Sequence, residues 1–260
     1  GQHPGFHHSG FQAITEGLAQ ANSTAAEVMR SIQLGITGPE TSKEAPPQAG
    51  QAIAFISAQA GEGKSVTSCY FARHLSQSGQ SVALVDGDFR RPTLTRWLTP
   101  EARQGVCEVA PRLASETREN VARELMGLCY RAARERLFFL PAAGCETSIT
   151  NGNLVSAAVM RAFVYYLKQM FDVVVLDVPP LMHMVDARAL AGAIDHFIFL
   201  AAWGQTDSHW VRQALARSPE VHEKTRGALL TRVDMTKEAR YGYGSYPCYG
   251  YPREAQHGRD

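Results

Sequence analysis

The chain has 260 residues, of which 45% are hydrophobic and 20% charged; this composition excludes a disordered protein, and the length suits one large α/β domain or two small ones. The 26 Lys and Arg residues balance the 25 Asp and Glu residues, so the net charge of +1 gives no indication of nucleic-acid binding. No apolar run reaches the roughly 18–20 residues of a membrane-spanning helix. The five cysteines contain no Cys-x-x-Cys pair, so we expect neither a disulfide framework nor a zinc site, as in a reducing cytoplasm.

Residues 1–50 are expected to form an N-terminal segment that contains one helix and a linker. The helix begins at Thr24-Ala-Ala-Glu27, a capping box in which the Thr hydroxyl and the Glu carboxylate each satisfy a free backbone N–H. Leu34-Gly35 supplies a stop. Residues 36–50 are rich in Pro, Gly, Thr and Ser, which is typical of a linker.

Short apolar runs alternate with longer amphipathic stretches between residues 51 and 235, which we assign to the main domain. Continuous apolar strands separated by helices indicate an α/β fold, with a mostly parallel central sheet flanked by helices on both faces. The expected strands are 52–57, 82–85, 137–140, 173–176, 196–201 and 228–231. The expected helices are 64–78, 117–135, 154–170, 186–193 and 207–217.

The first expected strand leads into Ala58-Gln-Ala-Gly-Glu-Gly-Lys-Ser65, a Walker A loop with Ala58 in place of the usual first Gly. Gly61 and Gly63 let backbone N–H groups approach phosphate oxygens, and the N-terminus of the next helix points to the same place. Lys64 is expected to contact the β/γ-phosphates of a nucleotide, and the Ser65 hydroxyl to bind Mg²⁺. A chance glycine-rich turn does not explain the strand–loop–helix order, so we expect a fold of the P-loop NTPase type.

Carboxylates follow two of the expected strands. Asp86 and Asp88 follow the second strand, and Asp177 follows the fourth. In a parallel sheet these ends lie beside the P-loop, where carboxylates hold Mg²⁺ directly or through water. One Asp at a strand end is commonly a helix cap, but three of them together with Lys64 and Ser65 favour a phosphoryl-transfer site.

Five of the nine tyrosines fall in an eleven-residue window near the C-terminus. Gly and Pro within this window exclude a helix or a central strand, so we expect 236–260 to be a flexible tail. Taken alone, the window also fits a low-complexity terminus that stacks against a neighbour. Attached to a P-loop domain, it is better explained as a set of phosphoacceptors, namely Tyr241, Tyr243, Tyr246, Tyr249 and Tyr251.

The order of three motifs resembles that of the bacterial tyrosine kinase family, the cytoplasmic kinase domains of capsular and exopolysaccharide co-polymerases. The Walker A loop is followed by Val-Asp-Gly-Asp-Phe-Arg-Arg-Pro at 85–92, similar to the family's Walker A′ motif, and by Val-Val-Leu-Asp-Val-Pro-Pro-Leu at 174–181, similar to its Walker B motif. The resemblance covers about 27–251. It implies an ATP- and Mg²⁺-dependent protein-tyrosine autokinase that phosphorylates its tyrosine tail in trans and regulates polysaccharide polymerisation and export.

The resemblance also implies a role for each matching residue. The nucleotide-binding set is Ala60, Gly61, Glu62, Gly63, Lys64, Ser65, Val66 and Arg232. The metal ligands are Ser65, Asp86 and Asp177, and the catalytic set is Lys64, Asp86 and Asp88. One carboxylate of the last two takes the proton of the attacking phenol, whose ordinary pKa is about 10, and we favour Asp86 for this role.

The expected partners follow from the same resemblance. They are further copies of this chain in a ring such as an octamer, held in part by Glu27 and Arg30, a membrane co-polymerase or activator domain, and a cognate tyrosine phosphatase. The expected location is the cytoplasmic face of the bacterial inner membrane, and no nucleic acid is expected to bind.

Two departures from the family pattern keep other functions open. Gln33 stands where the family's oligomerisation helix has a second Arg, and Thr231 stands where it usually has Asn before Arg-Val-Asp. A non-catalytic nucleotide-binding assembly module is therefore one alternative. A switching ATPase of the partition or septum-site type is another, although Gln59 replaces the second Lys of that class.

Overall fold

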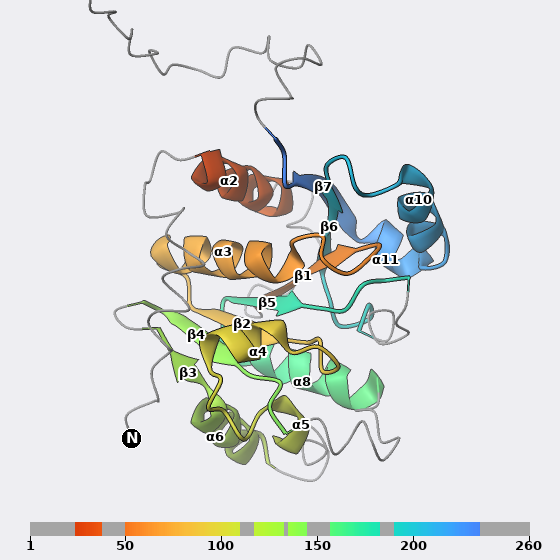
Figure 1. Ribbon diagram of the computed structural model, residues 1–260. Helices are drawn as coiled ribbons and strands as arrows, with labels where there is room; N and C mark the ends of the chain where they lie inside the picture. Colours follow the sequence, from red (N-terminus) through yellow and green to blue (C-terminus); the bar gives the residue numbers. More distant parts are fainter. Residues whose placement is uncertain are drawn as a thin grey trace, which may run out of the picture.

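The computed structural model describes residues 24–37, 50–109, 117–132, 135–144, 157–182 and 190–234. Within these ranges seven strands form one sheet in the order β3-β4-β2-β5-β1-β6-β7 (Figure 1). The strands are β1 (Gln51–Ser57), β2 (Val82–Asp86), β3 (Tyr130–Arg131), β4 (Leu137–Leu140), β5 (Val173–Asp177), β6 (His196–Ala202) and β7 (Thr225–Thr231). Every neighbouring pair is parallel except β3 and β4. The expected α/β fold with a mostly parallel sheet is confirmed.

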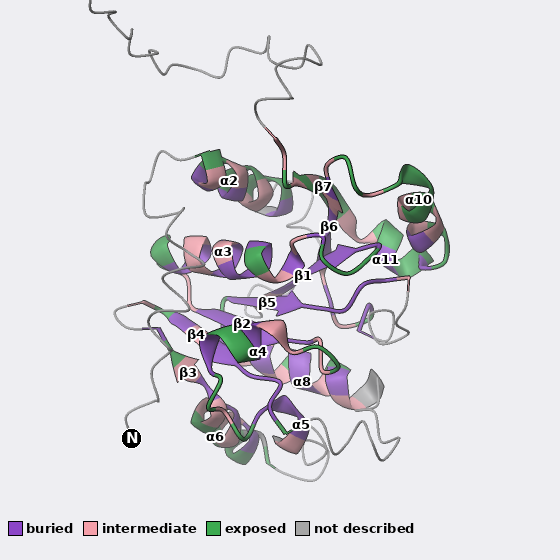
Figure 2. Ribbon diagram, viewed as in Figure 1, coloured by how far each residue is buried: buried purple, intermediate pink, exposed green. Residues whose placement is uncertain are grey.

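Helices cover both faces of the sheet, and Figure 1 shows α3 and α8 on opposite sides of β5. The described helices are α2 (Thr24–Thr37), α3 (Lys64–Gln77), α4 (Thr93–Leu98), α5 (Val106–Val109), α6 (Arg118–Leu128), α8 (Ala157–Met170), α10 (Ser208–Ala216) and α11 (Pro219–Glu223). One core contains side chains of α2, α3 and α4, and the other contains side chains of α6, α8, α10 and α11. The central strands are therefore buried on both sides (Figure 2).

Strand β1 shows how the sequence produces this double burial. Side chains alternate along a strand, so Ala54 and Ile56 enter the core with α8 while Phe55 enters the core with α3. Phe55 packs edge to face on Phe71 of α3, with ring centroids 5.5 Å apart. Both rings are wholly buried, so this pair anchors the helix that begins at the P-loop.

The expected 117–135 helix is wrong in its second half. Helix α6 ends at Leu128, and Cys129 is already extended. Tyr130 and Arg131 form β3, antiparallel to β4, where Arg131 lies over the Phe138 ring at 5.7 Å. Cross-strand contacts with an aromatic partner thus override a helical pattern that the sequence carries past residue 128.

Other differences are smaller. Helix α2 continues to Thr37, past the stop expected at Gly35. The short helices α4, α5 and α11 were not expected, and residues 190–193 form turns where the end of a helix was expected. Cys107 is disulfide-bonded, so the expectation of no disulfide is wrong at this residue, whereas Cys69 and Cys129 are free. No described helix has the length and apolar character needed to cross a bilayer.

Truncating Phe71 tests the anchoring of α3. Phe71→Ala removes a wholly buried ring, and we expect it to lower the free energy of unfolding by about 3–5 kcal/mol in urea denaturation. The control is Tyr165→Ala on α8, whose side chain is 58% exposed and which should change stability little. Equal losses in the two variants would contradict this account of the core.

Candidate functional site

The loop between β1 and α3 has the backbone geometry of a phosphate cradle. Gly61 and Gly63 have φ of 83° and 90°, in the left-handed region that favours glycine. A Cβ on Gly63 would also lie 3.2 Å from Cγ2 of Thr231. Any other residue at 63 would therefore be strained by its own backbone and by β7, at the point where α3 begins.

The buried Glu62 stabilises this loop through hydrogen bonds. Its carboxylate accepts hydrogen bonds from the backbone N–H of Gln59, at 2.7 Å, and from the hydroxyl of Thr206. Its carbonyl accepts a hydrogen bond from the Thr231 hydroxyl at 2.9 Å. Thr231, which departs from the family's Asn, thus ties the end of β7 to the P-loop.

Lys64 is folded back beneath the loop. Its Nζ donates to Oγ of Ser57 at 3.0 Å, and the Ser57 hydroxyl donates to the carbonyl of Gln59 at 2.6 Å. Burial lowers the pKa of Lys64, and the charges of Asp177, Asp88 and Glu62 act in the opposite direction. The Lys64 ammonium is therefore buried away from water and lies near three carboxylates. A bound phosphate would favour its charged form.

Asp177, at the end of β5, is the carboxylate with an unused oxygen. It is 1% exposed and accepts a hydrogen bond from the Ser65 hydroxyl, while its Oδ1 has no hydrogen-bond partner among the described residues. Burial raises the pKa of Asp177 to about 6, against the Ser65 hydrogen bond and the Lys64 charge. A buried, unpaired carboxylate oxygen beside a serine hydroxyl is a ligand pair that suits Mg²⁺.

Asp86 and Asp88 occupy different environments. Asp86 is wholly buried, and its Oδ2 accepts hydrogen bonds from the backbone N–H and the hydroxyl of Thr95, each at 2.8 Å. Its Oδ1 accepts the Asp88 N–H at 3.3 Å. Burial, and then the charge of Asp177, raises the pKa of Asp86 well above its usual value. Asp88 is only partly buried and borders a cavity, and burial raises its pKa as well.

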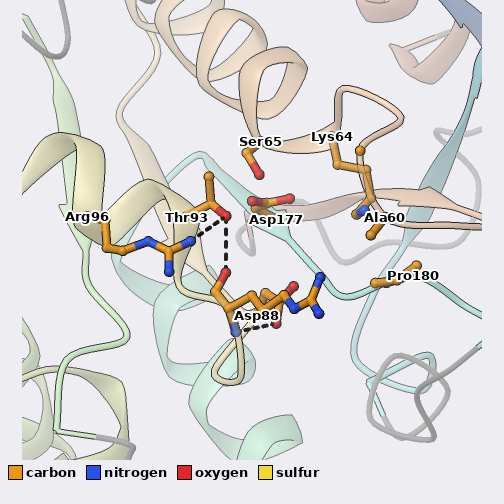
Figure 3. Close-up of a pocket in the computed structure, with 10 residues that line it drawn as sticks. Ala60, Lys64, Ser65, Asp88, Thr93, Arg96, Asp177 and Pro180 are labelled. Carbon is orange, nitrogen blue, oxygen red and sulfur yellow. Dashed lines mark hydrogen bonds between the residues drawn. The ribbon is translucent and has the colours of Figure 1, made fainter.

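These side chains meet at a cavity of about 380 Å³ between the P-loop, the end of β5 and α4 (Figure 3). It is lined by Ala60, Gly61, Lys64, Ser65, Asp88, Arg91, Thr93, Arg96, Asp177 and Pro180. Six of the expected site residues are therefore brought together, and Asp86 lies outside the lining. Four lining residues were not expected from the sequence, namely Arg91, Thr93, Arg96 and Pro180, although the Arg-Arg-Pro that closely follows Asp88 is a visible signal for the first of them.

The other expected site residues lie around this cavity or beyond the described residues. Val66 is on the first turn of α3 and 37% exposed. Arg232 has φ of 57°, and its guanidinium bonds Gln205 and reaches to 4.0 Å from where a Cβ of Gly61 would stand. Glu27 and Arg30 form an exposed ion pair on α2. The five tail tyrosines lie outside the described residues.

Comparison with known proteins decides the family. The family model described as ATPase MipZ matches residues 51–200, more than half of the chain. The chain belongs to that family. The match begins with β1 and includes the P-loop, Asp88 and Asp177, so the cavity is built from residues that the family model covers.

The resemblance to bacterial tyrosine kinases is also confirmed. The succinoglycan biosynthesis transport protein ExoP of Rhizobium meliloti (strain 1021) is 31% identical over 233 residues, which are 89% of this chain and 28% of ExoP. The tyrosine-protein kinase YwqD of Bacillus subtilis (strain 168) is 24% identical over 226 residues, 87% of this chain and 89% of YwqD. The chain thus spans little more than a quarter of ExoP but nearly all of YwqD.

A solved structure shares the fold. The kinase domain of the Escherichia coli tyrosine kinase ETK superposes with a TM-score of 0.65 and 17% identity, covering 86% of this chain and 82% of that one. At this identity the likeness shows the P-loop fold, and the expectation of that fold is confirmed.

The substitution Asp177→Asn tests whether the buried Asp177 carboxylate lacks a compensating charge when no cation is bound. Without Mg²⁺ and nucleotide, the negative charge of Asp177 destabilises the folded state above its folded pKa of about 6. This destabilisation disappears as the pH falls from there towards the pKa of the unfolded state. We therefore expect Asp177→Asn to stabilise the protein by about 1–3 kcal/mol at pH 8 and by much less at pH 4.5, in urea denaturation with EDTA.

The control for this measurement is Asp172→Asn. Hydrogen bonds from Ser81 lower the pKa of exposed Asp172, so its charge is favourable in the folded state and its removal should bring no gain. If Asp177→Asn is destabilising at pH 8, the idea of an uncompensated charge is wrong.

Proposed function

We propose that the chain is an ATP- and Mg²⁺-dependent protein-tyrosine kinase that phosphorylates the tyrosine cluster at 241–251 of a second copy. The observation that carries this proposal is a single cavity with Lys64 and Ser65 on one side and the carboxylate of Asp88 facing them. The names of ExoP and YwqD support a tyrosine kinase with a role in polysaccharide biosynthesis.

Ser65 and Asp177 are the residues that would hold Mg²⁺. Mg²⁺ is usually bound by one or two carboxylates together with substrate phosphates and water, and not by an all-protein cage. Accordingly, the part of the chain that the structure describes contains no group of three or more His, Cys, Asp or Glu side chains set to hold a metal. The ion would neutralise charge on the β- and γ-phosphates.

The residues of the cavity support an in-line transfer. The phenolic oxygen of the acceptor tyrosine forms a bond to the γ-phosphorus of ATP, and the bond from that phosphorus to the β–γ bridging oxygen breaks. ADP leaves with the electron pair, and the phenol proton passes to Asp88. Lys64 holds the phosphates, and the raised pKa of Asp88 makes it a better proton acceptor than an ordinary exposed carboxylate.

Asp88 replaces Asp86 as our candidate for the base. Both oxygens of Asp86 already accept hydrogen bonds, and two of these come from Thr95. Asp86 therefore suits a supporting role, in which it orients the backbone N–H of Asp88 and holds the start of α4. For the same reason we no longer propose it as a direct metal ligand.

The MipZ match favours a second candidate, a switching ATPase. In such a protein water takes the place of the phenol, and no phosphotyrosine accumulates. Gln59, where partition and septum-site ATPases have a second Lys, supports the kinase, as does the tyrosine cluster, which an ATPase does not require.

The wider assignments form part of the same proposal. Glu27 and Arg30, which form an exposed ion pair on α2, would contribute to a homo-oligomeric ring. A membrane co-polymerase domain, a tyrosine phosphatase and a place at the cytoplasmic face of the inner membrane would complete the system. The name of ExoP supports the link to polysaccharide transport.

Intact-mass spectrometry before and after ATP–Mg²⁺ tests the kinase directly. We expect up to five added phosphates on the wild-type chain, and none on Lys64→Ala or on a variant with all five tail tyrosines changed to Phe. Transfer in trans predicts that the active Tyr→Phe chain phosphorylates the tail of the Lys64→Ala chain when the two are mixed. Steady ATP hydrolysis without a mass change would favour the switching ATPase.

Asn substitutions distinguish the two carboxylates of the Walker A′ motif. Asp88→Asn should lower phosphate incorporation by about 10²–10⁴-fold, the usual contribution of a general base, while ADP binding by fluorescence titration is kept. Asp86→Asn retains an acceptor oxygen for Thr95 and should lose less than about tenfold, because it acts through position alone. A larger loss in Asp86→Asn would return the role of base to that residue.

A further inference from the structure

Two arginines line the cavity without a part in the chemistry described above. Arg91 follows the Walker A′ carboxylates, and Arg96 lies one turn into α4. Both are exposed, and no carboxylate among the described residues lies within 4.0 Å of either guanidinium. Nη2 of Arg96 donates a long hydrogen bond of 3.4 Å to the Thr93 hydroxyl, and the charge of Arg91 acts on the carboxylate of Asp88.

The charged side chains that line the cavity occupy three successive parts of it. Figure 3 shows Arg96 at one end and Lys64 with Ala60 at the other, with Asp88 and Asp177 between them. Lys64 belongs to the phosphate loop and is buried, so the nucleotide phosphates occupy that end. Arg96 stands beyond the carboxylates, at the end of the cavity that the phosphates leave to an acceptor of Asp88, and Arg91 lines the same cavity.

Two arginine side chains that line one cavity can both donate to a phosphate dianion bound there. Arginine presents a planar fork of donors that matches phosphate oxygens, and it is a common partner of phosphotyrosine. The window 241–251 contains no Asp or Glu, so an anion within that window can come only from an earlier phosphorylation. Its tyrosines are spaced by two or three residues, so neighbouring phenols on an extended chain stand about 7–10 Å apart.

We propose that Arg91 and Arg96 bind a phosphotyrosine already formed in the tail and so present the next tyrosine to Asp88. The inference rests on the proposed kinase function and adds a second subsite to it. The first phosphate is then added without help from the arginines, and the later ones follow faster.

A time course of intact masses tests this order. The wild-type chain should pass quickly from unmodified to multiply phosphorylated, with little singly phosphorylated protein. In Arg91→Gln/Arg96→Gln the second phosphate should form about tenfold more slowly, relative to the first, than it does in the wild-type chain, so that singly phosphorylated chain accumulates. Arg91→Lys/Arg96→Lys keeps the charge but loses the fork, and should fall between the two.

The matched control is Arg212→Gln/Arg217→Gln, which removes two exposed arginines of α10 and its C-terminus, away from the cavity. It should follow the wild-type series. If the cavity double variant also follows that series, the phosphotyrosine subsite is wrong while the kinase stands. If the wild-type chain gains no phosphate at all, the proposed function itself fails.

Direct binding gives a readout independent of turnover. A labelled peptide of residues 239–253 with phosphate on Tyr246 is titrated by fluorescence anisotropy against the chain with ADP and Mg²⁺, which keep the P-loop occupied. We expect it to bind about tenfold more tightly than the unphosphorylated peptide, and the difference to vanish in Arg91→Gln/Arg96→Gln. Equal affinities of the wild-type chain for the two peptides would overturn the inference.

Discussion

Two buried carboxylates lie side by side at the carboxyl ends of β2 and β5, and the arrangement of the site depends on how the charge of each is compensated. Strands β2 and β5 are parallel and in a register that pairs Asp86 with Asp177. Both are almost fully buried, and burial raises the pKa of each. Two anions in this position would be unfavourable unless each had a compensating group.

The two carboxylates are compensated in different ways. Asp86 accepts hydrogen bonds from the N–H and the hydroxyl of Thr95, and these bonds hold α4 against β2. Asp177 receives one hydroxyl from Ser65 and keeps a free oxygen towards the cavity. This asymmetry, and not the presence of aspartates as such, is why we propose a structural role for Asp86 and a cation-binding role for Asp177.

The sequence predicted the parts of the site that are local. The strand–loop–helix order around Lys64 and the Asp at the end of β5 depend on short stretches whose residue types restrict their geometry, and both lie where they were expected. The choice between Asp86 and Asp88 depends instead on Thr95, which belongs to a six-residue helix too short to show a periodic pattern. No local feature of the Walker A′ motif could have revealed that contact.

Long-range contacts explain the other misses. Thr231 departs from the family's Asn, and its hydroxyl donates to the carbonyl of Glu62, 169 positions earlier in the chain. The β3 pair lies inside a stretch with a helical pattern, and only its aromatic partner on β4 selects a strand. Periodicity reports the environment of one element, so it does not detect a partner that arrives from elsewhere in the fold.

The same distinction separates a kinase from an ATPase on this fold. Phosphate binding and metal binding need the P-loop, Ser65 and Asp177, and a switching ATPase needs these as well. Water is small and carries no recognition element, whereas a tyrosine arrives on a chain that must be held while its phenol reaches the base. The exposed side chains of Arg91 and Arg96 line the same cavity as Asp88 and would offer a surface to such a chain. Apart from Gln59 and the tyrosine cluster, the features that would favour the kinase are therefore those that hold the acceptor, and general nucleotide motifs do not supply them.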